Sequence, residues 1–205
     1  MLDSKEIRML ELLDEMILNC KKCSLHSGGK VLPYWTTLSK YVIIGEAPGR
    51  EEVENNEPFV GTAGGWLWKA MNKYGFRKEE FLIINSVQCR PTNGRKNLKP
   101  DIGQINTCRH IWKKYIKVLN PYRMLVLGNY AMGAVTGEYK GILNKNSRPY
   151  YSRTFESNFI ASVHPSYCIY NGQDGYNLLK KSIKIFRKWG SEEYEDFDYD
   201  IEEVF

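Results

Sequence analysis

The stretch YVIIGEAPGREE, residues 41–52, joins an apolar run directly to a turn that contains two glycines. A strand that ends in such a turn usually binds a phosphate. Here Glu46 follows the first glycine, and Pro48 removes a backbone N–H donor. Both features disfavour a phosphate, so the sequence predicts that this turn binds a different ligand.

Three more apolar runs follow, and helical patterns separate or flank all four. We predict strands at residues 41–45, 81–87, 123–128 and 158–164. We predict helices at about residues 4–19, 63–74, 101–118, 129–136 and 175–188. Buried strands that alternate with helices indicate an α/β fold with a parallel sheet covered on both faces.

Polar residues and glycines collect where three of these strands end. Residues 45–49 follow the first strand, Asn85 lies near the end of the second, and residues 163–166 (VHPS) follow the fourth. Ligands of open α/β sheets bind beyond the carboxyl ends of the strands. The sequence therefore predicts one crevice shared by these three segments.

Charge is divided unevenly along the chain. The net charge is +5, yet residues 191–205 (SEEYEDFDYDIEEVF) hold eight acidic residues and no basic one. Residues 1–190 therefore hold 29 basic against 16 acidic residues, a net charge of +13. Such a basic body favours nucleic acid as a partner, although a lysine-rich solvated surface is a plainer explanation. We expect one domain over residues 1–190 and a disordered acidic tail over residues 191–205.

The N-terminus and the cysteines indicate a compartment. Residues 1–18 mix acidic and basic side chains with apolar ones at helical spacing, which is typical of an amphipathic helix and not of a signal peptide. No stretch approaches the roughly 18 to 20 apolar residues of a membrane span. We expect a cytoplasmic, nucleoid-associated protein, either of a cell or of a virus acting in its host. In that compartment the five cysteines indicate metal ligands or free thiols.

Four cysteines form a candidate metal centre. Cys20 and Cys23 are separated by two residues, which lets both thiolates reach one metal, and Cys89 and Cys108 follow later in the chain. Four thiolates suit either a structural zinc or a [4Fe–4S] cluster, and the spacing does not separate the two. The alternative is four small buried apolar side chains. Cys168 has no partner in the sequence.

Three side chains near the predicted crevice suit the recognition of a flat polar ring. His164 precedes Pro165, which restricts it to an extended or turn conformation, and its ring could donate a hydrogen bond to developing negative charge. Asn85 offers a donor beside an acceptor, and Phe59 precedes a glycine-rich turn where it could stack on a ring. The plainer alternatives are a packed histidine, an asparagine that caps backbone and a core phenylalanine.

The motifs GEAPG (45–49), PFVGTAG (58–64), NSVQCRP (85–91) and VHPS (163–166), preceded by CxxC, together resemble the family-4 uracil-DNA glycosylases. The resemblance covers about residues 15–190. It implies a three-layer α/β/α sandwich with a central four-stranded parallel sheet. It also implies an enzyme that flips uracil out of DNA and hydrolyses its N-glycosidic bond, which initiates base excision repair.

The resemblance also implies roles for single residues. Phe59 would stack on the flipped base, Asn85 would bind the uracil edge at N3 and O4, and His164 would stabilise the leaving uracil anion through O2.

The floor of the pocket would be Gly45 with the backbone of Glu46 and Ala47, which would also position the attacking water. Ala47 stands where family-1 enzymes carry a water-activating Asp, so Glu46 or Glu52 would orient the water.

Contacts with DNA and with a cofactor follow from the same resemblance. Ser166 and Tyr167 belong to a loop that would wedge into the duplex. The substrate would be uracil-containing DNA, single- or double-stranded, bound by a monomer. The phosphate-binding residues would be Arg90, Arg95, Lys96 and Lys99. The ligands of a structural [4Fe–4S] cluster, preferred over zinc, would be Cys20, Cys23, Cys89 and Cys108.

The segment between Cys89 and Cys108 departs from the family pattern. It is a few residues longer than the family leads us to expect, and it contains no histidine. The missing histidine argues against the relatives that trap DNA covalently.

Three alternatives stay open from the sequence. The acidic tail could recruit a protein partner, mimic DNA over the basic face, or only solubilise the chain. The protein could be a catalytically silent DNA-binding or replication-accessory member of the same fold. It could also be a nucleotide-binding α/β protein with structural zinc.

Overall fold

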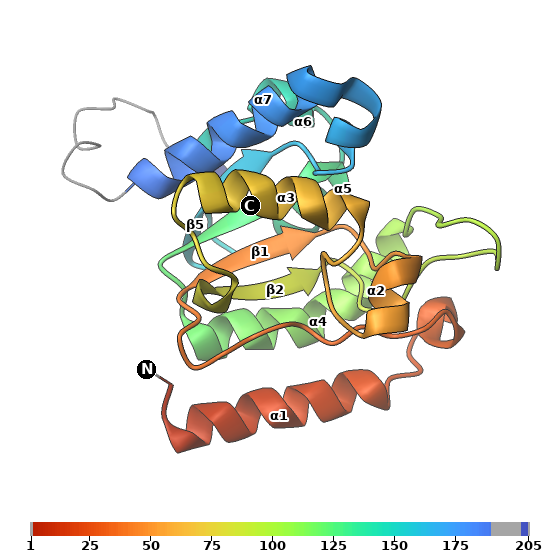
Figure 1. Ribbon diagram of the computed structural model, residues 1–205. Coiled ribbons are helices and arrows are strands. Elements are labelled where there is room, and N and C mark those ends of the chain that lie inside the picture. Colours follow the sequence, from red (N-terminus) through yellow and green to blue (C-terminus); the bar gives the residue numbers. More distant parts are fainter. Residues whose placement is uncertain (1, 190–201, 205) are drawn as a thin grey trace.

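The computed structural model describes residues 2–189 and 202–204, and it centres on a sheet of strand order β2-β1-β3-β5-β4-β6 (Figure 1). The first four of these strands pair in parallel. Their bounds are β1 Tyr41–Gly45, β2 Phe81–Asn85, β3 Arg123–Leu127 and β5 Ser157–Ser162. The prediction of four parallel strands is confirmed, and each strand lies within two residues of its predicted bounds.

The sheet is larger than predicted, because two short strands extend it beyond β5. Pro149–Ser152 form β4, which pairs antiparallel with β5, and Glu202–Val204 form β6, which pairs in parallel with β4. Neither strand has the apolar run that identified the others, since β4 (PYYS) and β6 (EEV) are short and contain polar residues. Residues 190–201 and 205 lie outside the described residues, so the disorder expected for the tail stays a prediction there.

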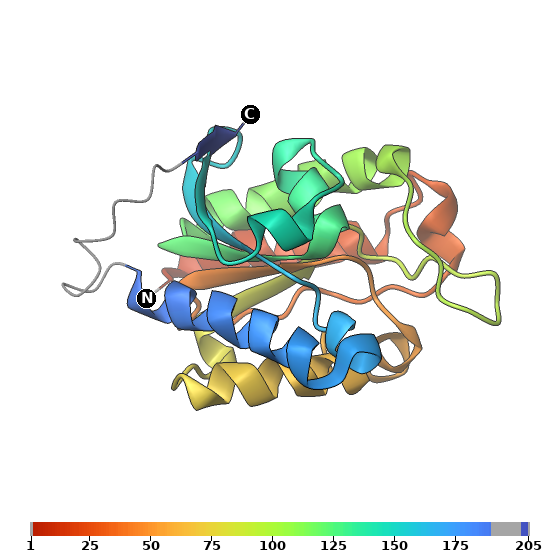
Figure 2. The same cartoon turned by 90° about the horizontal axis from the view of Figure 1, so that it is seen from above.

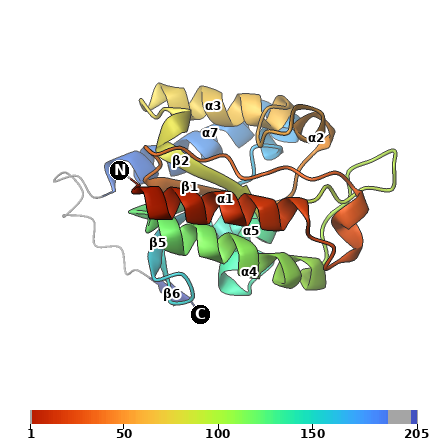
Figure 3. The same ribbon diagram turned by 90° about the horizontal axis from the view of Figure 1, so that it is seen from below.

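Helices cover both faces of the sheet, as the α/β/α prediction requires (Figure 2). Thr62–Lys73 (α3) and Tyr167–Lys188 (α7) pack on one face. On the other face lie α1, α4 and α5, and α1 runs beside α4 (Figure 3). Their bounds are Ser4–Leu18, Ile102–Leu119 and Gly128–Thr136. No helix among residues 2–189 is long and apolar enough to cross a membrane.

Two short helices and one helix start were missed. Arg50–Asn55 (α2) and Ile142–Lys145 (α6) are each less than two turns long, too short for a periodic pattern. Helix α7 begins eight residues before the predicted start at 175. Its first part is set apart by a kink at Gly172, where φ is 50°, and this kink interrupts the helical period.

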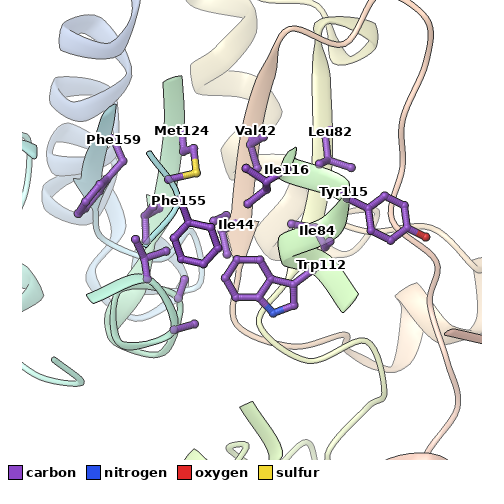
Figure 4. Close-up of a cluster of buried hydrophobic side chains, with 14 of the residues drawn as sticks. Val42, Ile44, Leu82, Ile84, Trp112, Tyr115, Ile116, Met124, Phe155 and Phe159 are labelled. Carbon is purple, nitrogen blue, oxygen red and sulfur yellow. The ribbon is translucent and has the colours of Figure 1, made fainter. Parts of the chain in front are cut away.

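The core consists of one apolar layer on each side of the sheet. Val42 and Ile44 face α4, whereas Ile43 faces α3 and α7, as alternation along a strand requires. In the first layer the rings of Trp112 and Phe155 stack with centroids 5.0 Å apart (Figure 4). Burying each large apolar side chain contributes about 1.5–3 kcal/mol, so these layers hold the strand ends in fixed positions.

Candidate active site

A cavity of about 520 Å³ opens at the carboxyl ends of β1, β2 and β5, where one crevice was predicted. Figure 1 shows α2 and the loop between β2 and α4 at this end of the molecule. We call it the first cavity. The predicted site residues in its wall are Glu46, Ala47, Glu52, Phe59, Asn85, Arg90, Arg95, Lys99, His164 and Ser166. Gly45, Lys96 and Tyr167 are not in this wall.

The register of β1 and β2 brings Gly45 beside Asn85. A Cβ atom on Gly45 would lie 2.3 Å from Asn85 Oδ1 and 2.7 Å from Phe59 Cζ, so only glycine fits between them. Asn85 is almost fully buried. Within the described residues no protein group hydrogen-bonds its side-chain amide, which leaves one donor–acceptor edge for a ligand in the first cavity.

Phe59 is held in an unusual backbone conformation, with φ at 57°. Its N–H donates to Glu52 Oε1 at 3.0 Å, and its carbonyl accepts from Trp68 Nε1 at 3.2 Å. Gly64 packs so closely that a Cβ there would lie 1.8 Å from the Phe59 carbonyl oxygen. Left-handed backbone is strained for an aromatic residue, and these contacts offset that cost. They fix the Phe59 ring in the cavity wall.

Glu52 joins the turn after β1 to Phe59. One carboxylate oxygen accepts from the Phe59 N–H and the other from the Gly49 N–H. Burial raises the pKa of Glu52, and the two N–H donors partly oppose that rise. Both oxygens therefore bind backbone and position Phe59 relative to the turn, and the water-orienting role suggested from the sequence stays a prediction.

His164 enters the first cavity from the segment after β5. Its Nδ1 accepts the Ser166 backbone N–H at 3.2 Å and lies 2.7 Å from Ser166 Oγ. Because Nδ1 accepts a hydrogen bond, the proton of the neutral ring belongs on Nε2. Desolvation, followed by the positive charge of Lys99, lowers the pKa of His164 to about 4, so the ring is neutral at pH 7. A neutral ring with a free Nε2–H can donate a hydrogen bond into the cavity.

Glu46 and Lys99 form an ion pair across the crevice. Lys99 Nζ lies 2.9 Å from Glu46 Oε1 and 3.1 Å from Oε2. Ser86 Oγ donates to the Glu46 carbonyl and anchors the turn on the other side. Lys99 is 64% exposed and Glu46 only 15%, so the lysine, from the loop between β2 and α4, covers a carboxylate in the cavity wall.

The four predicted metal ligands lie around a separate, small cavity of about 20 Å³. Its wall includes Cys20 and Cys23, from the segment that follows α1. It also includes Cys89, from the loop after β2, and Cys108, from α4. Burial and the neighbouring thiols raise the pKa of Cys89 to about 11 and that of Cys108 to about 12. No group of three or more His, Cys, Asp or Glu in the described part of the chain is close enough to hold a metal ion.

Some residues in the first cavity were not found from the sequence. Ile169 and Tyr170, on the first turn of α7, line its rim and are 47% and 84% exposed. Tyr167, predicted together with Ser166 to belong to a wedging loop, is half-buried. The sequence offers only a weak signal for Ile169 and Tyr170, because an Ile and a Tyr shortly after VHPS could equally be buried, and their exposure is known from the structure.

Comparison with known proteins identifies the family of the chain. A family model described as the uracil DNA glycosylase superfamily matches residues 33–188. A type-4 uracil-DNA glycosylase of Thermotoga maritima is 31% identical over 166 residues, which cover 80% of this chain and 84% of the relative. The enzyme of that name from Archaeoglobus fulgidus is 28% identical, over 93% of this chain and 100% of the relative.

A third relative, the type-4 uracil-DNA glycosylase of Pyrobaculum aerophilum, is 39% identical over 121 residues. That alignment covers 58% of this chain and 60% of the relative. The matches confirm the resemblance drawn from the four motifs and CxxC. The chain belongs to the uracil DNA glycosylase superfamily and, within it, to the type-4 uracil-DNA glycosylases.

Proposed function

We propose that this protein removes uracil from DNA by hydrolysing the bond between the base and C1′ of its deoxyribose, the first step of base excision repair. The observation that carries the proposal is the meeting of Phe59, Asn85 and a neutral His164 in one cavity at the strand ends. The family to which the chain belongs supports the same activity.

In this proposal the base is bound by its face and its edge. The Phe59 ring stacks on the flipped uracil, and its centroid lies 6.1 Å from that of His164. Asn85 accepts from uracil N3–H and donates to O4, a pattern that cytosine does not offer. The absent side chain of Gly45 leaves room for the Asn85 amide and the Phe59 ring to approach each other.

The chemical step needs stabilisation of a uracil anion. The bond from C1′ to N1 breaks with its electron pair leaving on uracil, water adds to C1′, and the water proton is released. His164 Nε2–H donates to uracil O2, where negative charge develops. The turn of Glu46 and Ala47 lies in the same wall and would position the water. The Glu46 carboxylate is paired with Lys99, which reduces its repulsion of the departing anion.

The family favours a [4Fe–4S] cluster over zinc as the group held by the four cysteines. Their thiols share one cavity with mostly apolar walls, and four thiolates are the usual ligands of such a cluster. When bound, the cluster would be structural and would tie the loop after β2 to the segment after α1. Iron and sulfide analysis with absorbance near 400 nm tests this. Cys108→Ser should lose iron, whereas Cys168→Ser, a buried cysteine outside this cavity, should keep it.

The DNA would lie across the basic rim of the first cavity. Arg90 and Arg95 line this rim and would contact phosphates, with Lys96 beside them on the same loop; Arg90 Nε also donates to Asn97 Oδ1 at 2.7 Å. We propose that the protein binds single- and double-stranded DNA as a monomer.

Release of uracil from a single-stranded oligonucleotide, scored by alkaline strand cleavage, tests the proposed function. Cleavage at uracil with none at a thymine control is expected. No cleavage by protein with a full complement of iron would contradict the proposal and would favour the silent DNA-binding alternative. The intact set of Phe59, Asn85 and His164 argues against that alternative.

A further inference from the structure

A second cavity, of about 350 Å³, lies beside the first and shares part of its wall. The shared residues come from the ion pair and from the segment after β5: Glu46, Lys99, His164, Ser166 and Tyr170. Its other side is formed by α5, α6 and the first turn of α7, including Tyr130, Leu143 and Tyr167. None of the roles proposed above uses this cavity.

The walls of the second cavity suit a flat ring attached to an anionic backbone. Tyr170 is 84% exposed and Leu143 is 53% exposed, so within the described part of the chain two large side chains at the rim are largely uncovered. Lys99 Nζ lies 5.5 Å from the centroid of the Tyr130 ring, which places a positive charge beside the aromatic wall. Aromatic walls with a nearby cation are typical of sites for single-stranded nucleic acid.

Continuity with the first cavity indicates which ring this would be. Consecutive bases of one strand are joined through a single phosphate, so a strand with uracil in the first cavity carries its neighbour to an adjacent site. Among the described residues, the Glu46–Lys99 pair, His164, Ser166 and Tyr170 line both cavities, so the two cavities are direct neighbours. At about 350 Å³ the second cavity has room for a purine or a pyrimidine.

We propose that the second cavity binds the base next to uracil in the same strand, stacked against Tyr170 and covered by Leu143. This inference rests on the proposed function of the first cavity. Because every base has an aromatic face, the subsite should accept any neighbouring base. The rate of uracil release should therefore depend more on whether a base is present there than on which base it is.

A double-mutant cycle on single-stranded oligonucleotides tests the subsite. Each strand carries one uracil, with a normal base or an abasic analogue on its 5′ or 3′ side. For the wild type, kcat/KM should fall about tenfold when the base on one side is missing, the scale of one stacked base. On the intact strand, kcat/KM of Tyr170→Ala should be about tenfold lower than that of the wild type. Removing the same base should then lower kcat/KM of Tyr170→Ala less than about twofold.

Matched controls separate the subsite from general effects. Tyr122→Ala removes another exposed tyrosine, 72% exposed and absent from both cavity walls, and should keep the wild-type response. Leu143 lines only the second cavity, so Leu143→Ala should reduce the tenfold loss that follows removal of the neighbouring base. Leu38 is similarly exposed but lines neither cavity, so Leu38→Ala should keep that loss. The proposal would be overturned if removing the neighbouring base still lowered kcat/KM of Tyr170→Ala by the full tenfold, or if neither abasic neighbour lowered kcat/KM of the wild type. If the wild type released no uracil, the proposed function would fail, and the same cycle measured as binding affinity would still test the subsite.

Discussion

At the residue scale, the protonation state of His164 follows from its surroundings. The backbone N–H of Ser166 points at Nδ1, and Lys99 adds a positive charge nearby. Desolvation by burial is the main cause that opposes a second proton on the ring, and these two features add to it. A neutral donor loses little free energy on desolvation and can still stabilise an anion that forms in the dry cavity.

Replacing His164 with alanine should lower kcat by about 10²–10³, the scale for loss of one donor to a developing anion. Uracil release under single-turnover conditions measures this. Thermal unfolding of the same variant is the control, since a folded protein is required. A variant that keeps more than a third of the activity would remove His164 from the mechanism.

The low pKa of His164 predicts a pH dependence of stability. The unfolded chain takes up a proton at His164 near pH 6.5, whereas the folded protein does so only near pH 4. The free energy of unfolding should therefore fall as the pH drops from about 6.5 to about 4, and this contribution should be fully retained above 6.5. Denaturant unfolding at pH 7 and pH 4.5 measures it, and His164→Gln should lose less stability than the wild type. An equal loss would contradict a buried neutral ring.

Gly45→Ala should reduce uracil release by about a hundredfold, because the new Cβ would displace the Asn85 amide or the Phe59 ring by about an ångström. Gly65→Ala is the matched control. Gly65 lies within α3 with no atom near its Cβ position, so alanine there should leave activity unchanged and raise stability by about 0.5–1 kcal/mol. Wild-type activity in Gly45→Ala would show that the close packing does not shape the pocket.

The sequence was informative for residues at strand ends. It was uninformative for side chains whose contacts depend on backbone conformation or join distant parts of the chain. Asn85 and His164 could be predicted because an amide in an apolar run and a histidine after one are conspicuous. The link from Glu52 to Phe59 could not, since it depends on the left-handed backbone at Phe59. The Glu46–Lys99 pair joins residues 53 positions apart, and nothing in the local pattern indicates it.

At the element scale, helix α2 connects two parts of the pocket wall, the turn after β1 and Phe59. Its Glu52 binds the N–H of Gly49 before the helix and that of Phe59 after it.

The pattern of apolar residues predicted the long helices and the four parallel strands. It could not predict α2, α6 or β4, because each is too short for a period to repeat.

Glu52→Gln should weaken the connection that Glu52 makes between Gly49 and Phe59. A Gln side chain keeps one carbonyl oxygen for two backbone donors, so one buried N–H loses its acceptor at a cost of about 1–3 kcal/mol. We expect about a tenfold fall in kcat/KM together with lower stability. Glu54→Gln, on the exposed side of α2, should change neither. Unchanged kinetics in Glu52→Gln would rule out the positioning role.

At the scale of the whole molecule, opposite charges occupy the two parts of the chain. Residues 1–190 carry +13 and residues 191–205 carry eight acidic residues. If the tail mimics DNA over the basic face, deleting residues 191–205 should tighten DNA binding several-fold at 50 mM salt, and the gain should shrink at high salt. Fluorescence anisotropy with a uracil-free oligonucleotide measures the affinity. The same affinity with and without the tail would exclude the mimic.

The pairing of Gly45 with Asn85 across β1 and β2 has a consequence for heat inactivation. The amide that would read the base is part of the central sheet, so it cannot become disordered while the sheet stays intact. Catalytic sites built on mobile loops often fail before the protein melts. Here the loss of base discrimination on heating should coincide with the cooperative unfolding of the whole domain, and samples cooled from below that temperature should recover full selectivity.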